Sequence, residues 1–209
     1  MQSKPKGLLL VVSGPAGVGK GTIDKILLER HSNMKLSVSA TTRNPRPGEV
    51  DGVHYFFIDE DKFRSMIDNG EFLEYMHVFN LHYYGTPRSF VEKELEQGND
   101  VLLEIDVNGA KRVKESYPDA VLVFIAPPDL KQLKARLVGR GTETPEQIEK
   151  RFGTAVEEIR QIEHYDYTVV NDVLEDAVKQ VESIISAEKS RVSRNTALVE
   201  ELTAGGTEK

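Results

Sequence analysis

The stretch SGPAGVGKGT, from Ser13 to Thr22, has the residue types and spacing of a phosphate-binding loop. It fits the pattern G-x-x-x-x-G-K through Gly14, Gly19 and Lys20. Backbone N–H groups at a helix start attract anions, and Lys20 adds a positive charge for β and γ phosphates. We therefore predict a nucleoside triphosphate site with ATP as the donor. Its loop residues are Gly14, Pro15, Ala16, Gly17, Val18, Gly19, Lys20, Gly21 and Thr22.

Gly21 departs from this pattern. The residue after the lysine is ordinarily a Ser or Thr whose hydroxyl reaches Mg²⁺, whereas here the first hydroxyl belongs to Thr22. Mg²⁺ habitually keeps phosphate oxygens and several waters as ligands. We therefore expect Mg²⁺ as the cofactor, held mainly by the phosphates of ATP and by water. No direct protein ligand is assigned to it.

A second anion site is expected in the stretch SATTRNPRPGEVDGVHYFF, residues 39–57. Arg43 and Arg46 lie three residues apart, and Pro45 and Pro47 restrict the chain between and after them. Guanidinium groups held in this way suit the oxygens of a phosphate. Hydroxyl donors are available from Tyr55, Tyr83 and Tyr84. A solvated Arg-Pro turn is the alternative, but a triphosphate loop elsewhere in the chain favours an acceptor that is itself a phosphate.

A basic helical segment supplies further cations through Arg136, Arg140 and Arg151. The second phosphate pKa of a nucleoside monophosphate is ~6, so its attacking oxygen is ionised at pH 7 without a general base. Catalysis can then consist of positioning and of neutralising the charge of the transferred group. We expect these arginines to act there together with Lys20 and Arg43. A basic helix surface without catalytic function is the alternative for each arginine of the segment.

Three carboxylates are candidates for reading the acceptor base. Guanine presents adjacent N1–H and N2–H donors that one carboxylate can accept as a pair, and adenine has no such pair. Glu74 lies in a segment of strand-like alternation. Glu104 and Asp106 lie two residues apart at the end of a core strand, where parallel sheets bind their ligands. Ser39 and Arg43 can donate to guanine O6, and an ordinary surface position is the alternative for each acid.

Four short apolar runs must position these side chains. They are Leu8–Ser13, Val101–Ile105, Val121–Ile125 and Tyr167–Val170. Continuous apolar strands separated by helices predict an α/β fold with a parallel sheet that helices cover on both faces. A further helix is expected from the apolar stripe between Leu174 and Ile185.

Composition divides the chain into four parts. The predicted P-loop core comprises residues 1–36, 99–128 and 166–189. The turn-rich and aromatic segment 37–98 is predicted as an inserted mixed α+β subdomain, and 129–165 as a helical lid. Thr144 and Gln147 predict a capping box at the start of a lid helix. The polar segment 190–209 is predicted as a frayed tail.

The overall composition is that of an ordinary soluble globular protein. The chain has 209 residues, of which 39% are hydrophobic and 29% are charged, and its net charge is −7. This charge gives no reason to expect nucleic-acid or membrane binding, and the lack of cysteine excludes disulfides and thiolate metal sites. The N-terminal apolar run is too short for a signal peptide, so we expect a cytoplasmic protein. A homo-oligomer is left open.

Six motifs, in order along the chain, resemble those of bacterial guanylate kinases, which are nucleoside monophosphate kinases. They are SGPAGVGKGT, TTRNPRPGE, YYGTP, LEIDVNG, FIAPP and GRGTET, within a resemblance from about Gly7 to Lys189. The resemblance implies Mg²⁺-dependent, reversible phosphoryl transfer from ATP to GMP, giving ADP and GDP, in purine nucleotide metabolism. It implies a GMP-binding subdomain at 37–98 and an adenine pocket near Asn171. It also implies that the lysine and arginine side chains already named assist transfer of the phosphoryl group. The GMP-binding set is then Ser39, Arg43, Arg46, Glu49, Tyr55, Glu74, Tyr84, Thr86, Glu104 and Asp106.

Two rival interpretations remain open. Adenylate kinases share the GKGT form of the loop, but the carboxylates and the stretch TTRNPRPGE disfavour them. A module that resembles guanylate kinase and binds phosphopeptides is the rival from another class. Such modules carry decayed phosphate loops, whereas Lys20 and the lid arginines are present here.

Overall fold

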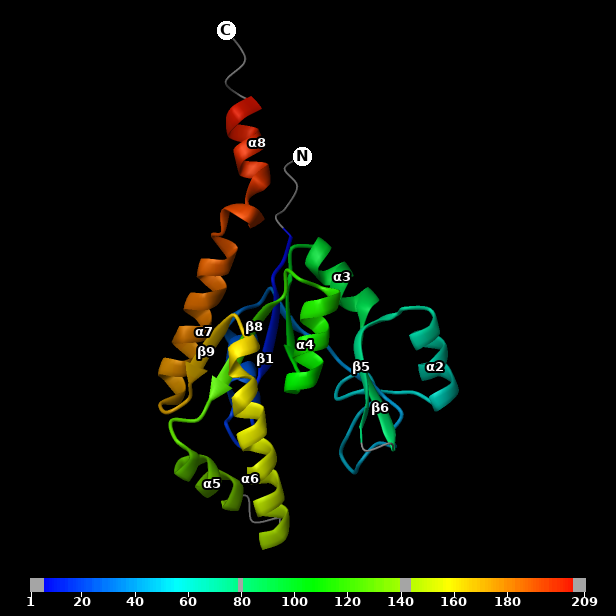
Figure 1. Ribbon diagram of the computed structural model, residues 1–209. Coiled ribbons are helices and arrows are strands. Elements are labelled where there is room, and N and C mark those ends of the chain that lie inside the picture. Colours follow the sequence, from blue (N-terminus) through cyan, green and yellow to red (C-terminus); the bar gives the residue numbers. More distant parts are fainter. Residues whose placement is uncertain (1–5, 79–80, 140–143, 205–209) are drawn as a thin grey trace.

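The centre of the protein is a five-stranded parallel sheet in the order β2-β7-β1-β8-β9 (Figure 1). The structure is a computed structural model that describes residues 6–78, 81–139 and 144–204. The strands of this sheet are β1 (Leu9–Ser13), β2 (Met34–Leu36), β7 (Asp100–Glu104), β8 (Val121–Ala126) and β9 (Tyr167–Val170). The predicted α/β fold with a parallel sheet is therefore confirmed.

Both faces of the sheet are buried around its inner strands, which is why β1 and β8 are apolar almost throughout, whereas the edge strands β2 and β9 are partly exposed. Leu10 and Val12 of β1 belong to a cluster that includes residues of α1 (Lys20–Arg30) and α7 (Leu174–Lys189). Leu9 and Val11 point to the opposite face, into a cluster with α3 (Arg88–Glu96) and α4 (Val107–Ser116). Burying one such side chain stabilises the fold by about 1.5–3 kcal/mol.

A smaller, mixed sheet of order β4-β3-β6-β5 lies within segment 37–98, to one side of the parallel sheet (Figure 1). Its elements are β3 (Ala40–Thr41), β4 (Phe56–Phe57), β5 (Phe72–Val78), β6 (His82–Pro87) and helix α2 (Glu60–Asp68). Phe63 of α2 is fully buried and stacks on Phe72 with ring centroids 4.4 Å apart. This contact fixes the helix on the sheet, and segment 37–98, with this sheet and its loops, carries most of the side chains expected to bind the acceptor.

Helices α5 (Leu130–Val138) and α6 (Pro145–Ile159) pack against each other, and a 3-10 helix η1 (Arg160–His164) follows. The predicted capping box is present: Gln147 N–H donates to Thr144 Oγ1 at 3.3 Å, and Thr144 N–H donates to Gln147 Oε1 at 2.9 Å. Arg140 lies outside the described residues, so its role stays a prediction.

The frayed tail predicted from residue 190 is wrong for the described part of that segment. The chain instead forms a 3-10 helix η2 (Val192–Arg194) and helix α8 (Thr196–Ala204), which extends away from the parallel sheet (Figure 1).

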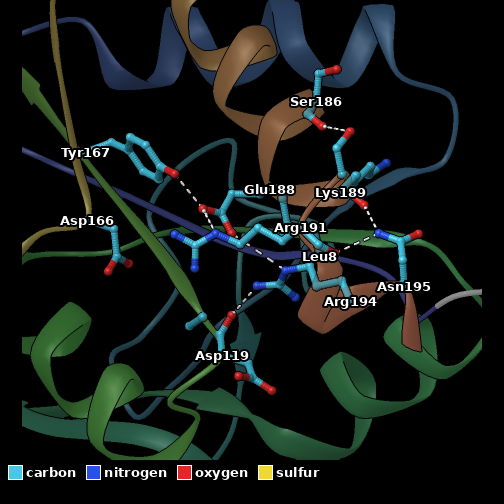
Figure 2. A network of polar contacts seen from close by, with 12 residues as sticks. Leu8, Asp119, Asp166, Tyr167, Ser186, Glu188, Lys189, Arg191, Arg194 and Asn195 are labelled. Carbon is cyan, nitrogen blue, oxygen red and sulfur yellow. Dashed lines mark hydrogen bonds and ion pairs between the residues drawn. The ribbon is translucent and has the colours of Figure 1, made fainter. Parts of the chain in front are cut away.

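The contacts of Glu188, at the end of α7, hold the chain that follows it in a defined conformation. Glu188 is 1% exposed, accepts a hydrogen bond from Tyr167 Oη at 2.5 Å and pairs with Arg191 and Arg194 (Figure 2). Arg194 also donates to the carbonyl oxygen of Asp119 at 2.7 Å. A polar composition conceals these contacts because Tyr167 and Asp119, which tie Glu188 and Arg194 to the rest of the fold, lie far away in the sequence.

Candidate active site

The glycine loop connects the end of β1 to the start of α1. Three of its residues have positive φ: Gly14 at 144°, Gly17 at 87° and Gly19 at 98°. A Cβ at Gly14 would lie 2.2 Å from the carbonyl oxygen of Ile125, so only glycine fits there. Such a chain of left-handed residues before a helix N-terminus forms a concave anion site.

Lys20 is the first residue of α1, and its side chain folds back over the loop. Its ammonium group donates to the carbonyl oxygens of Gly14 and Pro15. The positive charge therefore lies directly at the loop that would bind phosphate.

Asn171 supports this loop from the end of β9. Its buried Nδ2 donates to the carbonyl oxygen of Val18 at 2.8 Å, and a Cβ at Gly19 would lie 2.6 Å from that nitrogen. Both terminal nitrogens of Arg136 donate to the Asn171 carbonyl oxygen at 3.1 Å. Sequence reasoning gave Asn171 a place beside adenine, whereas its contacts here fix the loop and place Arg136 of α5 next to it.

A cleft of about 280 Å³ lies between the two sheets. Predicted acceptor residues that line it are Ser39, Tyr55, Glu74, Tyr84, Glu104 and Asp106. Lining residues that sequence reasoning missed include Met76, Gly85, Ile105 and Gly109. These have no polar side chain, so no chemical pattern in the sequence identifies them.

Glu74 is the most buried acid of the cleft, with 8% of the residue exposed. Burial raises the pKa of its carboxyl group to about 7, although a hydrogen bond from Thr86 acts in the opposite direction. Thr86 Oγ1 donates to Glu74 Oε1 at 2.8 Å and is itself fully buried. Thr86 was expected to contact guanine. Its hydrogen bond orients the Glu74 carboxylate, and its contact with guanine stays a prediction.

Arg43 is held by a bidentate ion pair with Glu49, with both N–O distances at 2.9 Å. Its Nε donates to Tyr84 Oη at 3.2 Å, and its guanidinium lies 5.5 Å from the centre of the Tyr55 ring. Hydrogen bonds from Arg43 lower the pKa of Glu49 to about 2. Glu49 also accepts from the backbone N–H of Arg46, whose side chain is exposed. Of the two predicted arginines, the structure therefore fixes the side chain of Arg43 only.

Asp106 lies just after the core strand, at the carboxyl end where the sequence predicted it. Strand β7 ends at Glu104, and Asp106 is the N-cap of α4, where its Oδ1 accepts from Asn108 N at 2.9 Å and Gly109 N at 2.8 Å. This capping orients the carboxylate toward the cleft that Glu104 also lines.

Glu158 of helix α6 lies within electrostatic range of Lys20 in the loop and of Arg151 on its own helix. Burial raises the pKa of Glu158, and the charges of Lys20, Asp106 and Arg151 also act on it. These side chains therefore share one electrostatic environment, which includes the predicted cation Arg151. Sequence reasoning missed Glu158, whose position on the inner face of α6 follows only from the packing.

Asp24, in the second turn of α1, was also missed. Burial and the nearby Glu104 raise the pKa of its carboxyl group to about 8. The available signal was its position one helical turn after Lys20.

Two further features of the described residues concern metal binding and membranes. Among the described residues, no group of three His, Cys, Asp or Glu side chains could hold a metal ion by itself. In the same part of the chain, every helix is too short or too polar to cross a membrane.

Comparisons with known proteins agree with this geometry. The family model described as guanylate kinase matches residues 6–188. The guanylate kinase of Clostridioides difficile strain 630 is 57% identical over 189 residues, covering 90% of this chain and 92% of that protein. The chain belongs to the guanylate kinase family.

Further guanylate kinases support this membership. That of Caldanaerobacter subterraneus subsp. tengcongensis is 53% identical over 198 residues, covering 95% of this chain and 96% of its own length. The crystal structure of guanylate kinase from Anaplasma phagocytophilum has a TM-score of 0.73 at 34% identity and covers 91% of this chain and 90% of its own. The segment matched by the guanylate kinase family contains the loop and the cleft, whereas α8 lies beyond it.

Proposed function

We propose that this protein transfers the terminal phosphoryl group of ATP to GMP, reversibly and with Mg²⁺, giving ADP and GDP. As a member of its family it is an enzyme, an ATP:GMP phosphotransferase. One observation carries the proposal. The loop with Lys20 and the acidic cleft meet at the carboxyl end of one parallel sheet, where β7 pairs with β1 so that Glu104 lies opposite Val12.

The cleft would bind GMP. Glu74 would accept the N1–H and N2–H groups of guanine, in the orientation that Thr86 gives it. Arg43 and Tyr84 would contact the phosphate, with Glu49 fixing the direction of the guanidinium group. Adenine has no matching donor pair, so this arrangement would select guanine.

The loop would bind the phosphates of ATP, with Mg²⁺ on their oxygens. The ion would neutralise charge on the transferred group. Gly21 has no side chain, so it supplies no hydroxyl ligand for the ion. Lys20, Arg136 and Arg151 would stabilise the charge that develops in transfer, since they lie at the loop or share its electrostatic environment. The acceptor phosphate is already ionised at neutral pH, so no general base is required.

An ADP-release assay with ATP and each of GMP, AMP, CMP and UMP tests this proposal. We expect turnover with GMP to exceed that with each of the other three acceptors by at least about a hundredfold. A preference for AMP would indicate an adenylate kinase. Phosphopeptide binding without turnover on any monophosphate would indicate an interaction module.

A further inference from the structure

Asp24 is a buried carboxylate that lacks a partner. It is 3% exposed, and neither of its carboxylate oxygens has a hydrogen-bond partner among the described residues. Burying such a group without a partner is costly, so its presence calls for a ligand. Asp24 follows Gly21 by three residues and Lys20 by four, so all three lie on one face of α1.

Glu104 lies across from the position where the loop lacks its hydroxyl. A Cβ built on Gly21 would have the two carboxylate oxygens of Glu104 as neighbours, at 3.7 and 4.0 Å. Among charged groups, Glu104 and Lys20 act most strongly on Asp24. An acid at the end of the strand beside the loop strand is the usual second holder of Mg²⁺ in P-loop enzymes. The first holder is the loop hydroxyl, and Gly21 does not supply it.

We propose that Asp24 and Glu104 together hold the hydrated Mg²⁺ that accompanies ATP, with Asp24 taking the place of the missing hydroxyl. This inference rests on the proposed use of ATP with Mg²⁺. Mg²⁺ prefers oxygen ligands and keeps several waters, so two carboxylates beside phosphates can accept hydrogen bonds from those waters. The unpartnered oxygens of Asp24 fit this task, and at Gly21 the nearest atoms to a Cβ are the Glu104 oxygens in ordinary contact, which are acceptors for a water bound there.

Mn²⁺ binding followed by electron paramagnetic resonance tests the inference, with the enzyme saturated by a non-hydrolysable ATP analogue. Asp24→Asn keeps the shape of the side chain and removes its charge. We expect it to weaken the affinity of the enzyme–analogue complex for Mn²⁺ by about tenfold to a hundredfold, the range for losing an outer-shell partner. Glu29→Gln, on an exposed face of the same helix, is the matched control and should behave as wild type.

A rescue variant separates a metal-holding role from a structural one. Adding Gly21→Ser to Asp24→Asn supplies the hydroxyl that the loop lacks, and the space at position 21 accepts a Cβ in ordinary contact. We expect the double variant to regain most of the Mn²⁺ affinity. A structural defect at Asp24 would not be repaired by a hydroxyl at position 21, so failure of the rescue would contradict the proposed replacement.

Binding of the ATP analogue to the enzyme, measured without metal, tests the proposed function separately from the proposed metal site. Unchanged Mn²⁺ affinity in Asp24→Asn, with analogue binding intact, would overturn the inference and leave the proposed function standing. Loss of analogue binding in the wild type would overturn both. If Asp24→Asn does not fold, Glu104→Gln at an exposed position serves as the second variant, and unchanged Mn²⁺ affinity there would equally overturn the inference.

Discussion

Replacing Glu74 by Gln should make the protein more stable and bind GMP more weakly. Burial raises the pKa of the Glu74 carboxyl group from 4.5 to about 7, so the folded state holds this proton more tightly than the unfolded state. The difference corresponds to about 3 kcal/mol, because a tenfold change in an equilibrium constant is worth about 1.4 kcal/mol. A neutral amide of the same shape escapes this penalty, and its oxygen can still accept from Thr86.

The pH dependence follows from proton binding. Between pH 4.5 and about 7 the folded wild type binds more protons than the unfolded chain, so its free energy of unfolding falls as the pH rises. Below this range Glu74 is neutral in both the folded and the unfolded state. Above it the carboxyl group is ionised in both states, and the decrease in the free energy of unfolding is complete. We expect Glu74→Gln to match the wild type near pH 4 and to exceed its free energy of unfolding by up to about 3 kcal/mol at pH 8. Asp24 titrates in both proteins, so its contribution cancels in the difference.

Urea denaturation followed by circular dichroism, at a series of pH values from about 4 to 8, measures this difference. Titration calorimetry with GMP at pH 8 measures the affinity of the wild type and the variant for GMP. We expect affinity to fall by about tenfold to a hundredfold, because the amide presents a donor where guanine requires an acceptor. A stability difference that does not change with pH would refute the argument from burial. Unchanged GMP affinity would mean that a different carboxylate reads the base.

Three further variants test other parts of the site and the fold. Lys20→Met should fold normally, as judged by circular dichroism, and lose at least about a hundredfold in turnover, because a charge at the phosphates is removed; near-normal turnover would contradict the loop assignment. Gly109→Ala would bring a Cβ within 3.4 Å of Glu74 Oε2 and should weaken GMP binding severalfold in calorimetry, whereas Gly153→Ala, with open space around it, should leave binding unchanged. Glu188→Ala should lower the free energy of unfolding by about 2 kcal/mol in urea, by removing the buried acceptor of the C-terminal network, without loss of turnover; equal stability would show that the network contributes nothing.

Local rules account for what the sequence predicted well. The apolar strands, the glycine loop and the capping box at Thr144 each depend on neighbouring residues in the chain, so their patterns are visible without a structure. The boundaries of the four predicted central strands came within one residue for the same reason, whereas the short edge strand β2 was not predicted.

Residues whose function depends on a distant partner could not be predicted in this way. Thr86 and Glu74 lie twelve residues apart, and only the pairing of β5 with β6 shows that one orients the other. Asp24 is an unremarked acid in α1 until β7 places Glu104 near it. The ordered C-terminal segment was missed because it is held through the distant partners Tyr167, which donates to Glu188, and Asp119, whose carbonyl oxygen accepts from Arg194.

The site gathers acidic side chains where cations and hydrogen-bond donors are expected to bind. Burial raises the pKa values of Asp24, Glu74 and Glu158, and neighbouring acids raise them further. Each raised pKa lowers stability at neutral pH, so the fold maintains this arrangement at a cost. Guanine would bring donors to Glu74 and hydrated Mg²⁺ would bring positive charge to Asp24, so the same ligands that react would relieve the repulsion. The unfavourable burial of these acids therefore favours binding of GMP and of ATP with Mg²⁺, because each ligand would supply a partner to a buried acid.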